Sequence, residues 1–310
     1  MDHHPLLVVL GPTASGKTKL AVKLASALRG EIISADSRQV FKNMDIGTGK
    51  DLQEYQLDGK NIPYHLINIK EAGEKYNVNE FKDDFYRTFE SLTSRNVLPI
   101  LCGGTGMYIH SILLEQEYTA IPINEALRAQ LLPKAIAELR AMLANYPKEQ
   151  VGHADLSSHK RLIRVIEIAE YLKHHEFTPV KRPFITPFIV GLQTDVTLRR
   201  AKILTRMEAR FKEGMIEEVK MLLEMGVARE TLIFYGLEYK FIIAYLDGEL
   251  DYETMKIRLG TAICQFSKRQ MTFFRKMEKD GLKFHWFDAA QNEADLYGQV
   301  MTAYQQDLSF

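Results

Sequence analysis

The chain has 310 residues, 46% of them hydrophobic, and its 40 basic and 40 acidic residues cancel. This length and composition exclude a disordered chain and allow a large core in one domain or two. No apolar run reaches the roughly 18 residues of a membrane span, and the run before the first glycine is too short for a signal peptide, so we expect a cytoplasmic protein without a membrane partner. Cys102 and Cys264 lack partners at ligand spacing, which argues against a disulfide framework and a zinc site.

Short apolar runs alternate with amphipathic segments over the first 110 residues. We expect strands at 6–10, 31–34 and 97–102, and helices at 18–28 and near 78–94. This βαβ rhythm predicts a parallel sheet with helices on its faces.

The pattern changes after residue 114. Helical periodicity at 127–143 and 161–172 is interrupted by prolines, and another strand is expected at 187–192. We interpret residues 115–186 as a helical insertion into a core formed by residues 1–114 and 187–310. The C-terminal part is expected to be mostly helical, with helices at 197–214, 216–225, 241–246 and 252–277.

A phosphate-binding motif joins the first expected strand to the first expected helix. It consists of Gly11, Pro12, Thr13, Ala14, Ser15, Gly16, Lys17 and Thr18. Such a loop directs backbone N–H groups and the positive helix end at one spot, where a di- or triphosphate can bind. Lys17 would reach a terminal phosphate and the Thr18 hydroxyl a Mg²⁺ ion. The sequence therefore predicts an α/β fold with a P-loop NTPase-like parallel sheet, and leaves the phosphate ester open.

Asp36 follows the second expected strand and should reach the same sheet edge as the motif. The strand at 97–102 ends in Gly103-Gly104-Thr105-Gly106, where a P-loop ATPase normally has an acidic residue for its Mg²⁺. This argues against plain nucleotide hydrolysis. Asp36 could still take that part, so a small-molecule kinase stays an alternative.

Basic residues are concentrated in the second half of the chain. Residues 157–276 hold 21 Lys and Arg against 15 Asp and Glu, mainly in three blocks at 160–164, 199–212 and 268–276. One such block would be read as a solvated helix face. Three blocks beside a phosphate loop favour a polyanionic ligand.

Six segments in this order resemble the tRNA dimethylallyltransferases, and together they extend from residue 11 to residue 275, with only 114–156 matching loosely. They are GPTASGKT at Gly11, ISADSRQVFKNMDIGTGK at Ile33, IPYHLINI at Ile62, GGTGMYIHSIL at Gly103, RMEARFKEGMIEEV at Arg206 and FSKRQMTFFR at Phe266. Enzymes of this family transfer a prenyl group from dimethylallyl diphosphate to the N6 amine of the adenine just 3′ of the anticodon.

The resemblance implies roles for individual residues. The loop would hold the diphosphate of the donor in place of ATP, and Asp36 would accept a proton from, or hydrogen-bond, the adenine N6. Thr18 and Arg210 would stabilise the departing diphosphate together with Mg²⁺. Without the resemblance, Arg210 would be read as a helix-surface arginine.

The resemblance also implies tRNA as a partner, bound by its anticodon stem-loop, with the adenine extruded into a pocket. The insertion at 115–186 would then bind tRNA, and we expect a monomer. The implied tRNA contacts are Asp36, Ser37, Arg38, Gln39, Thr105, Arg128, Lys160, Arg161, Arg164, Lys268 and Arg269. Arg128 could equally be a solvated helix charge.

Four segments depart from the family pattern. The family usually has Asn-Asp-Pro at Ser157-Ser158-His159, an aromatic and a basic residue at Leu237-Glu238, Thr-Arg at Ile263-Cys264, and Trp at Phe273. The donor motif is intact, so the chemistry is a firmer expectation than the choice of tRNA. Prenylation of free AMP is an alternative that the basic blocks disfavour. A non-catalytic RNA-binding protein is disfavoured by the joint presence of Lys17, Thr18, Asp36 and Arg210.

Overall fold

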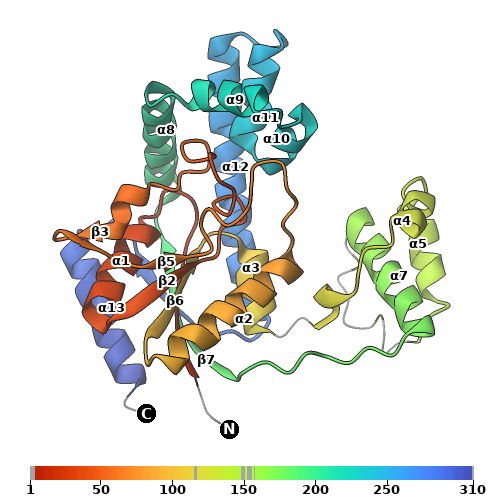
Figure 1. The fold of residues 1–310 in the computed structure, drawn as a ribbon, viewed down its shortest axis with the longest axis horizontal. Coiled ribbons are helices and arrows are strands. Elements are labelled where there is room, and N and C mark those ends of the chain that lie inside the picture. Colours follow the sequence, from red (N-terminus) through yellow and green to blue (C-terminus); the bar gives the residue numbers. More distant parts are fainter. Residues whose placement is uncertain (1–3, 115–116, 148–150, 152–155, 157, 309–310) are drawn as a thin grey trace. The chain divides into compact units, whose positions relative to one another are not determined.

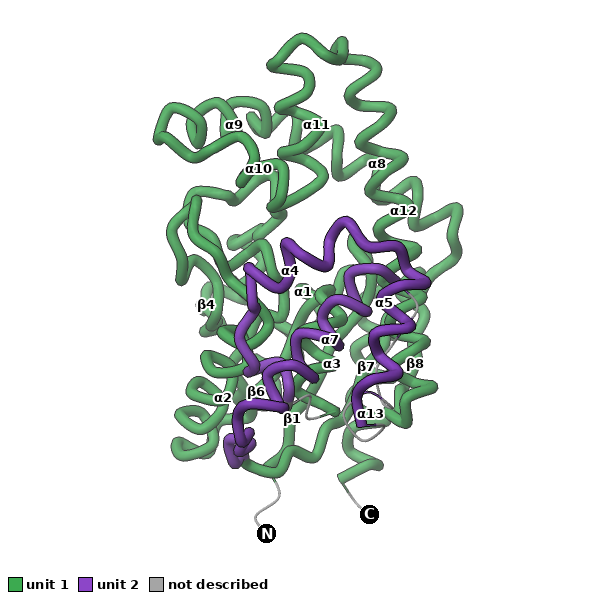
Figure 2. Tube along the Cα trace, turned by 90° about the vertical axis from the view of Figure 1, so that its right-hand side faces the viewer, with its two compact units in different colours: residues 1–114, 183–310 green, residues 115–182 purple. Residues whose placement is uncertain are grey.

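The structure is a computed structural model that describes residues 4–114, 117–147, 151, 156 and 158–308. The chain divides into two compact units, drawn in two colours in Figure 2. Unit 1 comprises residues 1–114 and 183–310, and unit 2 comprises residues 115–182.

Unit 1 is built on a six-stranded sheet with the strand order β5-β2-β6-β1-β7-β8, in which every pairing is parallel. The strands are β1 (His4–Leu10), β2 (Gly30–Ser34), β5 (Tyr64–His65), β6 (Leu98–Gly103), β7 (Ile185–Gln193) and β8 (Phe284–Asp288). A short helix η1 (Leu52–Tyr55) and the two-stranded ribbon β3 (Gln56–Leu57) and β4 (Lys60–Asn61) lie between β2 and β5 in the chain. The predicted α/β fold class is confirmed.

Successive residues of β1 face opposite sides of the sheet, as the pleat requires. Leu7 and Val9 pack with α1 (Lys17–Leu28) and α13 (Glu293–Asp307) on one side. Leu6, Val8 and Leu10 pack on the other side with α2 (Val78–Ser94), α3 (Gly106–Leu113) and the end of α12 (Tyr252–Lys279). Figure 1 shows these helices around the sheet. Both faces are therefore covered, which explains why the core strands are apolar without alternation.

The helices after β7 form a separate apolar cluster with the chain that follows Asp36. They are α8 (Val196–Lys212), α9 (Met215–Glu224), α10 (Arg229–Tyr235), α11 (Leu237–Leu246) and the first half of α12. Val40, Phe41 and Met44 are buried in this cluster. The buried Glu218 accepts hydrogen bonds from the backbone N–H groups of Asp45, Ile46 and Gly47 at 2.6–3.0 Å, and from the Tyr239 hydroxyl at 2.9 Å. The cluster thus fixes the polar segment between Asp36 and Lys50.

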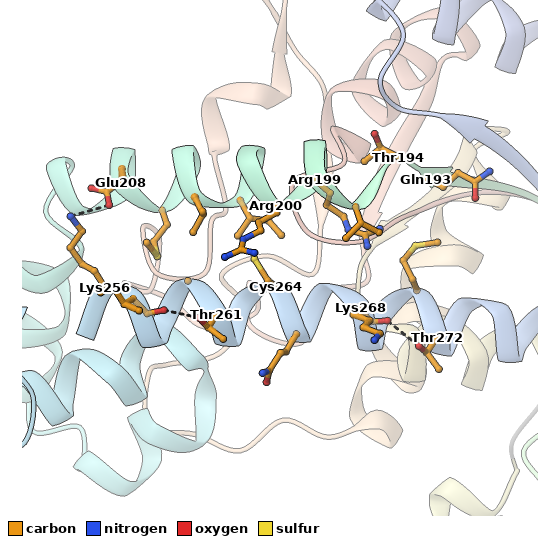
Figure 3. A pocket seen from close by; sticks show the side chains of 18 of the residues that line it. Gln193, Thr194, Arg199, Arg200, Glu208, Lys256, Thr261, Cys264, Lys268 and Thr272 are labelled. Atoms are coloured by element: carbon orange, nitrogen blue, oxygen red, sulfur yellow. Dashed lines mark hydrogen bonds and ion pairs between the residues drawn. The ribbon is translucent and has the colours of Figure 1, made fainter. Parts of the chain in front are cut away.

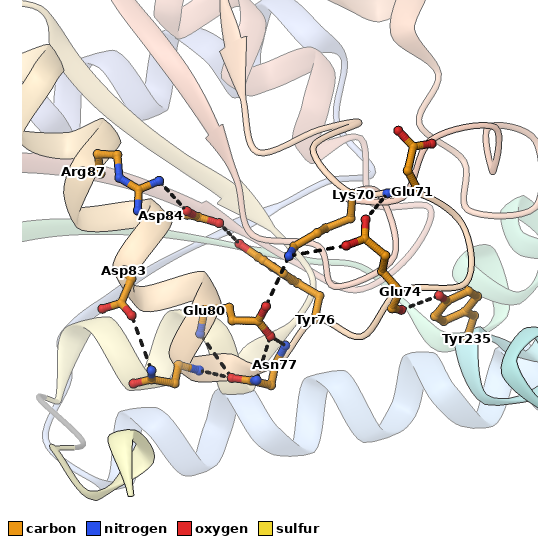
Figure 4. A network of polar contacts seen from close by, with 11 residues as sticks. Lys70, Glu71, Glu74, Tyr76, Asn77, Glu80, Asp83, Asp84, Arg87 and Tyr235 are labelled. Atoms are coloured by element: carbon orange, nitrogen blue, oxygen red, sulfur yellow. Dashed lines mark hydrogen bonds and ion pairs between the residues drawn. The ribbon is translucent and has the colours of Figure 1, made fainter. Parts of the chain in front are cut away.

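A polar network fixes the segment that enters α2 (Figure 4). Asn77 caps the helix and exchanges hydrogen bonds with Glu80 in a capping box, and Lys70 lies 3.3 Å from the Glu80 carboxylate. The Tyr235 hydroxyl donates to the Glu74 carbonyl at 2.5 Å and accepts from the Gly73 N–H at 2.9 Å. Through Tyr235, this segment is tied to α10.

Unit 2 is a small helical unit with its own apolar core. Its elements are η2 (Glu117–Ala120), α4 (Glu125–Leu131), α5 (Ile136–Leu143) and α7 (His159–His174). Leu131, Leu139, Leu162 and Ile166 are among its buried residues. The stretch at 127–143 is two helices because Pro133 cannot continue a helix. Ser157, one of the departures from the family pattern, lies outside the described residues.

The described helices include none with the length and apolar character needed to span a membrane.

Candidate active site

The phosphate-binding motif forms the turn between β1 and α1. Gly16 precedes α1 in the left-handed region, at φ 78°, and no side chain caps the helix. The first turn of α1 contains no acidic residue, so no carboxylate of that turn competes with an anion for its free N–H groups and positive end. The Ser15 hydroxyl is buried and makes no hydrogen bond in the structure. These features suit the phosphate site that the sequence predicts.

Lys17 and Asp36 both lie at the carboxyl edge of the sheet, Lys17 after β1 and Asp36 after β2. Burial lowers the pKa of Lys17, and the neighbouring Cys102 and Asp36 partly oppose this effect. Asp36 lies two residues after the end of β2, and its carboxylate accepts a hydrogen bond from the Arg38 N–H at 2.9 Å. The predicted donor loop and the predicted base therefore lie at one site.

The glycine turn after β6 supports the Asp36 segment. The Thr105 hydroxyl oxygen accepts from the Ser37 N–H at 3.0 Å, and the Thr105 N–H donates to the Ala35 carbonyl at 3.1 Å. A Cβ on Gly103 would lie only 2.2 Å from the Ala35 oxygen. The glycines therefore permit the close approach of the two strand ends that positions Asp36.

Arg38 and Gln39 are engaged within the protein. The Gln39 amide accepts from the Ser34 hydroxyl at 3.2 Å and donates to the Gly49 carbonyl at 3.1 Å. The Arg38 guanidinium donates to the Phe234 carbonyl at 3.1 Å and lies 5.6 Å from the Phe234 ring centre. Burial lowers the pKa of Arg38. Their contacts with tRNA remain predictions.

Arg210 and Arg206 bring a second cationic face to the site from α8. Arg210 is 7% exposed, with Nη2 3.6 Å from a carboxylate oxygen of Asp51, and its Nε and Nη2 make no hydrogen bond. Arg206 donates to the Thr13 hydroxyl within the motif. Burial and the neighbouring Arg210 lower the pKa of Arg206 to about 10, so the guanidinium stays charged at neutral pH. Arg210 is thus a buried cation with free donors, unlike a helix-surface arginine.

Arg206 is a site residue that the sequence analysis missed. It precedes Arg210 by four residues, a spacing that places both side chains on one helix face. That spacing is the signal that could have identified it.

Gln270 on α12 is a second missed residue. Its side-chain oxygen accepts from the Thr13 N–H at 2.9 Å, and its side-chain nitrogen donates to the Gly104 carbonyl at 2.9 Å. One amide therefore joins the phosphate loop to the glycine turn. Its neighbours Lys268 and Arg269 are exposed, as predicted tRNA contacts must be.

The predicted tRNA contacts in unit 2 fall into two groups. Lys160 and Arg161 are exposed at the start of α7. Arg128 donates to both oxygens of the buried Glu167, at 3.0 and 2.7 Å. Arg164 donates to the carbonyls of Tyr118, Ile121 and Pro122 at 2.6–3.3 Å. Arg128 and Arg164 therefore stabilise the unit, and a tRNA contact by either remains a prediction.

Three of the residues that depart from the family pattern, Glu238, Phe273 and Ile263, are buried or packed against neighbours in the structure. Glu238 lines a cavity of about 10 Å³ together with Arg206 and Arg210, so it lies beside the donor-side arginines. Burial raises the pKa of Glu238, an effect that the arginines partly oppose. Phe273 packs against Gly106, where a Cβ would lie 2.3 Å from the ring, and Ile263 belongs to the apolar cluster of the C-terminal helices.

Several known proteins are similar to this chain in sequence, and solved structures are similar to it in fold. The family model for "IPP transferase" matches residues 39–277, and that for "Isopentenyl transferase" matches residues 4–69. The chain is 50% identical over 299 residues to tRNA dimethylallyltransferase 2 of Porphyromonas gingivalis, covering 96% of this chain and 99% of that protein. It is 50% identical over 294 residues to tRNA dimethylallyltransferase 1 of Parabacteroides distasonis, covering 93% and 94%.

Among solved structures, the full-length tRNA isopentenylpyrophosphate transferase of Bacillus halodurans matches with a TM-score of 0.72 at 27% identity, covering 99% of this chain and 97% of that one. The resemblance read from the six sequence segments is confirmed, and the chain belongs to the IPP transferase family.

Proposed function

We propose that this protein transfers a dimethylallyl group from dimethylallyl diphosphate to the N6 amine of the adenosine on the 3′ side of the anticodon in tRNA. The observation that carries the proposal is that the cationic phosphate loop and Asp36 follow β1 and β2, the two strands that flank β6, at one edge of the sheet. Relatives named as tRNA dimethylallyltransferases are similar over nearly the full length. In the reaction, N6 bonds to the allylic carbon, the carbon–oxygen bond breaks with its electron pair passing to diphosphate, and N6 loses a proton.

The donor side is suited to a leaving group that gains negative charge. Lys17, Arg206 and Arg210 supply three cationic side chains, and Arg210 has unused donors. Fixed charges in a partly buried site stabilise developing charge better than water does, because they need not reorient. These residues would bind the diphosphate and stabilise it as it departs.

The acceptor side needs a base beside the attacking amine. Asp36 is held by the Arg38 N–H and by the turn around Thr105, which leaves the other carboxylate oxygen available to N6. Asp36 would orient the amine and accept its proton.

Mg²⁺ is the cofactor that we propose. No cluster of three or more His, Cys, Asp or Glu residues fit to hold a metal occurs in the part of the chain that the structure describes. Mg²⁺ does not require such a cluster, since it commonly uses one or two protein oxygens with substrate phosphates and water. The Thr18 hydroxyl in the first turn of α1, together with the donor diphosphate, fits this pattern. The ion would neutralise part of the diphosphate charge.

A labelling experiment tests the function. The protein is incubated with dimethylallyl diphosphate labelled in the prenyl group and with an anticodon stem-loop, AMP, or a stem-loop carrying guanine at the target position. Label should enter only the adenine stem-loop, because guanine has oxygen at position six in place of the amine. Preferential labelling of AMP, or of the guanine stem-loop, would contradict the tRNA assignment.

Inorganic diphosphate should compete with the prenyl donor, and ATP should be neither hydrolysed nor required. The reason is that Lys17, Arg206 and Arg210 recognise a diphosphate whose phosphorus atoms take no part in the reaction. Initial rates at several donor concentrations measure the competition. Mg²⁺-dependent ATP turnover that exceeds prenyl transfer would favour the kinase alternative.

Doubling the salt concentration should weaken tRNA binding several-fold, because phosphate contacts release counterions. Replacing the exposed Lys160 and Arg161 by alanine should reduce the slope of log affinity against log salt concentration. Arg164→Ala serves as the contrasting variant, since its lost carbonyl contacts should chiefly destabilise unit 2. Filter binding and thermal denaturation measure the two effects, and an unchanged slope would exclude Lys160 and Arg161 as phosphate contacts.

We also propose that the protein acts as a monomer in the cytoplasm. The location follows from the proposed substrate, tRNA.

A further inference from the structure

A cavity of about 790 Å³ lies between α8 and α12, on the side of α8 that leads to β7 (Figure 3). Leu204, Met207, Ile257 and Met271 give it an apolar lining. Gly260 faces α8 so closely that a Cβ there would lie 2.8 Å from Leu204 Cδ2. Because these lining side chains are apolar, the cavity can receive an aliphatic group.

Arg199 enters this cavity from α8 as a buried charge. It is only 8% exposed, and its side chain extends from α8 toward α12 (Figure 3). Within the described residues, no hydrogen bond or ion pair engages its guanidinium. Arg199 is not among the fully buried side chains without a partner, so its guanidinium is open to the cavity, and an anion that enters there can form a charge-assisted contact with it.

The two ends of the cavity differ in charge. Lys256 is paired with Glu208 at 2.9 Å at the far end, where Glu253 also lies. Around Arg199 the lining includes the further cations Arg200, Lys268 and Arg275 and no carboxylate. Asp195 occupies the first N–H groups of α8, accepting from Thr197 and Leu198 at 2.7 and 3.2 Å. Side chains must therefore supply the contacts to an anion here.

This cavity is separate from the candidate active site. Arg206 and Arg210 line the smaller cavity with Glu238, and the two cavities share only Ile203 and Met207 as lining residues. Neither the phosphate loop nor Asp36 lines the larger one. A ligand bound there would not occupy the donor position.

We propose that the cavity between α8 and α12 binds a small amphiphilic anion, whose phosphate or carboxylate head pairs with Arg199 and whose aliphatic chain lies along α8 toward Glu208. Arg199 and Glu208 are nine residues apart, which corresponds to about 13 Å along a helix and to a chain of about ten carbons. The proposal does not depend on the proposed function.

Titration calorimetry with decyl phosphate, below its micellar concentration, tests the site. The wild-type protein and the variant Arg258→Met, changed at an exposed position of α12 outside the cavity, should bind it equally. Arg199→Met should bind at least tenfold more weakly, because a charge-assisted contact is lost while the aliphatic stem is kept. Decanol and inorganic phosphate should each bind at least tenfold more weakly than decyl phosphate, since each lacks one half of the ligand.

Thermal denaturation separates binding from folding. Without ligand, Arg199→Met should melt at the temperature of the wild type, since no protein partner of the guanidinium is lost, and decyl phosphate should no longer raise the melting temperature. A fall of several degrees would show a structural role and overturn the proposal.

Retained binding by Arg199→Met would also overturn the proposal. Loss of binding in Lys17→Ala would overturn it too, because it would place the ligand on the phosphate loop. Displacement of decyl phosphate by an anticodon stem-loop would assign the cavity to RNA phosphates instead.

Discussion

Replacing Asp36 by alanine should lower the rate of prenyl transfer by roughly 10²- to 10⁴-fold, the range expected when a positioned base is lost. Affinity for tRNA should stay within a few fold, because a carboxylate contributes little to the binding of a polyanion. Single-turnover labelling of an anticodon stem-loop at saturating donor measures the chemical step.

Asp36→Asn is the matched variant for this experiment. The asparagine oxygen can still accept from the Arg38 N–H, so the turn should keep its shape while the basicity is lost. Both variants should therefore be similarly slow. A rate near that of the wild type in either one would remove Asp36 as the base.

Gly49→Ala should reduce prenyl transfer by roughly 10²- to 10³-fold, about as much as removing one preorganised charge-stabilising group. A Cβ at this position would lie 1.6 Å from Arg210 Nη2, so the guanidinium would have to leave its place. Gly49 also has φ +63°, a conformation that costs an L-residue about 1–2 kcal/mol. The effect on rate should match that of Arg210→Ala.

Gly59→Ala separates the two causes. Gly59 also has a positive φ, +75°, but nothing lies within 4 Å of its Cβ position. In thermal denaturation, both glycine variants should lose the stability that a positive φ costs, and Gly49→Ala should lose more because it also displaces the buried Arg210. Only Gly49→Ala should lose activity. Equal activity of the two variants would show that the position of Arg210 does not matter for turnover.

The sequence predicted the central part of the fold because its signals are local. The apolar runs of β1, β2 and β6 and the glycine-bearing motif are contiguous, and each appears in the structure close to its expected place. The edge strand β8 and the helix α13 were not predicted. The residues of β8 are only partly buried, so its sequence lacks the continuous apolar run of a central strand.

The site was predicted only where a residue lies in a recognisable motif. Gln270 stands between basic residues that suggested an RNA contact, and its bond to Thr13 spans 257 positions of the chain. Arg128 and Arg164 show a related case, since their charges suggested a phosphate ligand and nothing in the sequence indicated their contacts with Glu167 and with backbone carbonyls. Pairing between distant side chains is set by packing, which a single sequence does not reveal.

The amide of Gln270 connects the phosphate loop to the helix that carries two of the predicted RNA contacts. It is carried by α12, a helix of 28 residues and about 42 Å, in which the exposed Lys268 and Arg269 lie two and one residues before Gln270. If α12 shifts when RNA binds, the hydrogen bonds that join the Gln270 side chain to Thr13 and Gly104 change length. By reciprocity, occupancy of the phosphate loop must then change the affinity for RNA by the same factor as RNA changes the affinity for the donor.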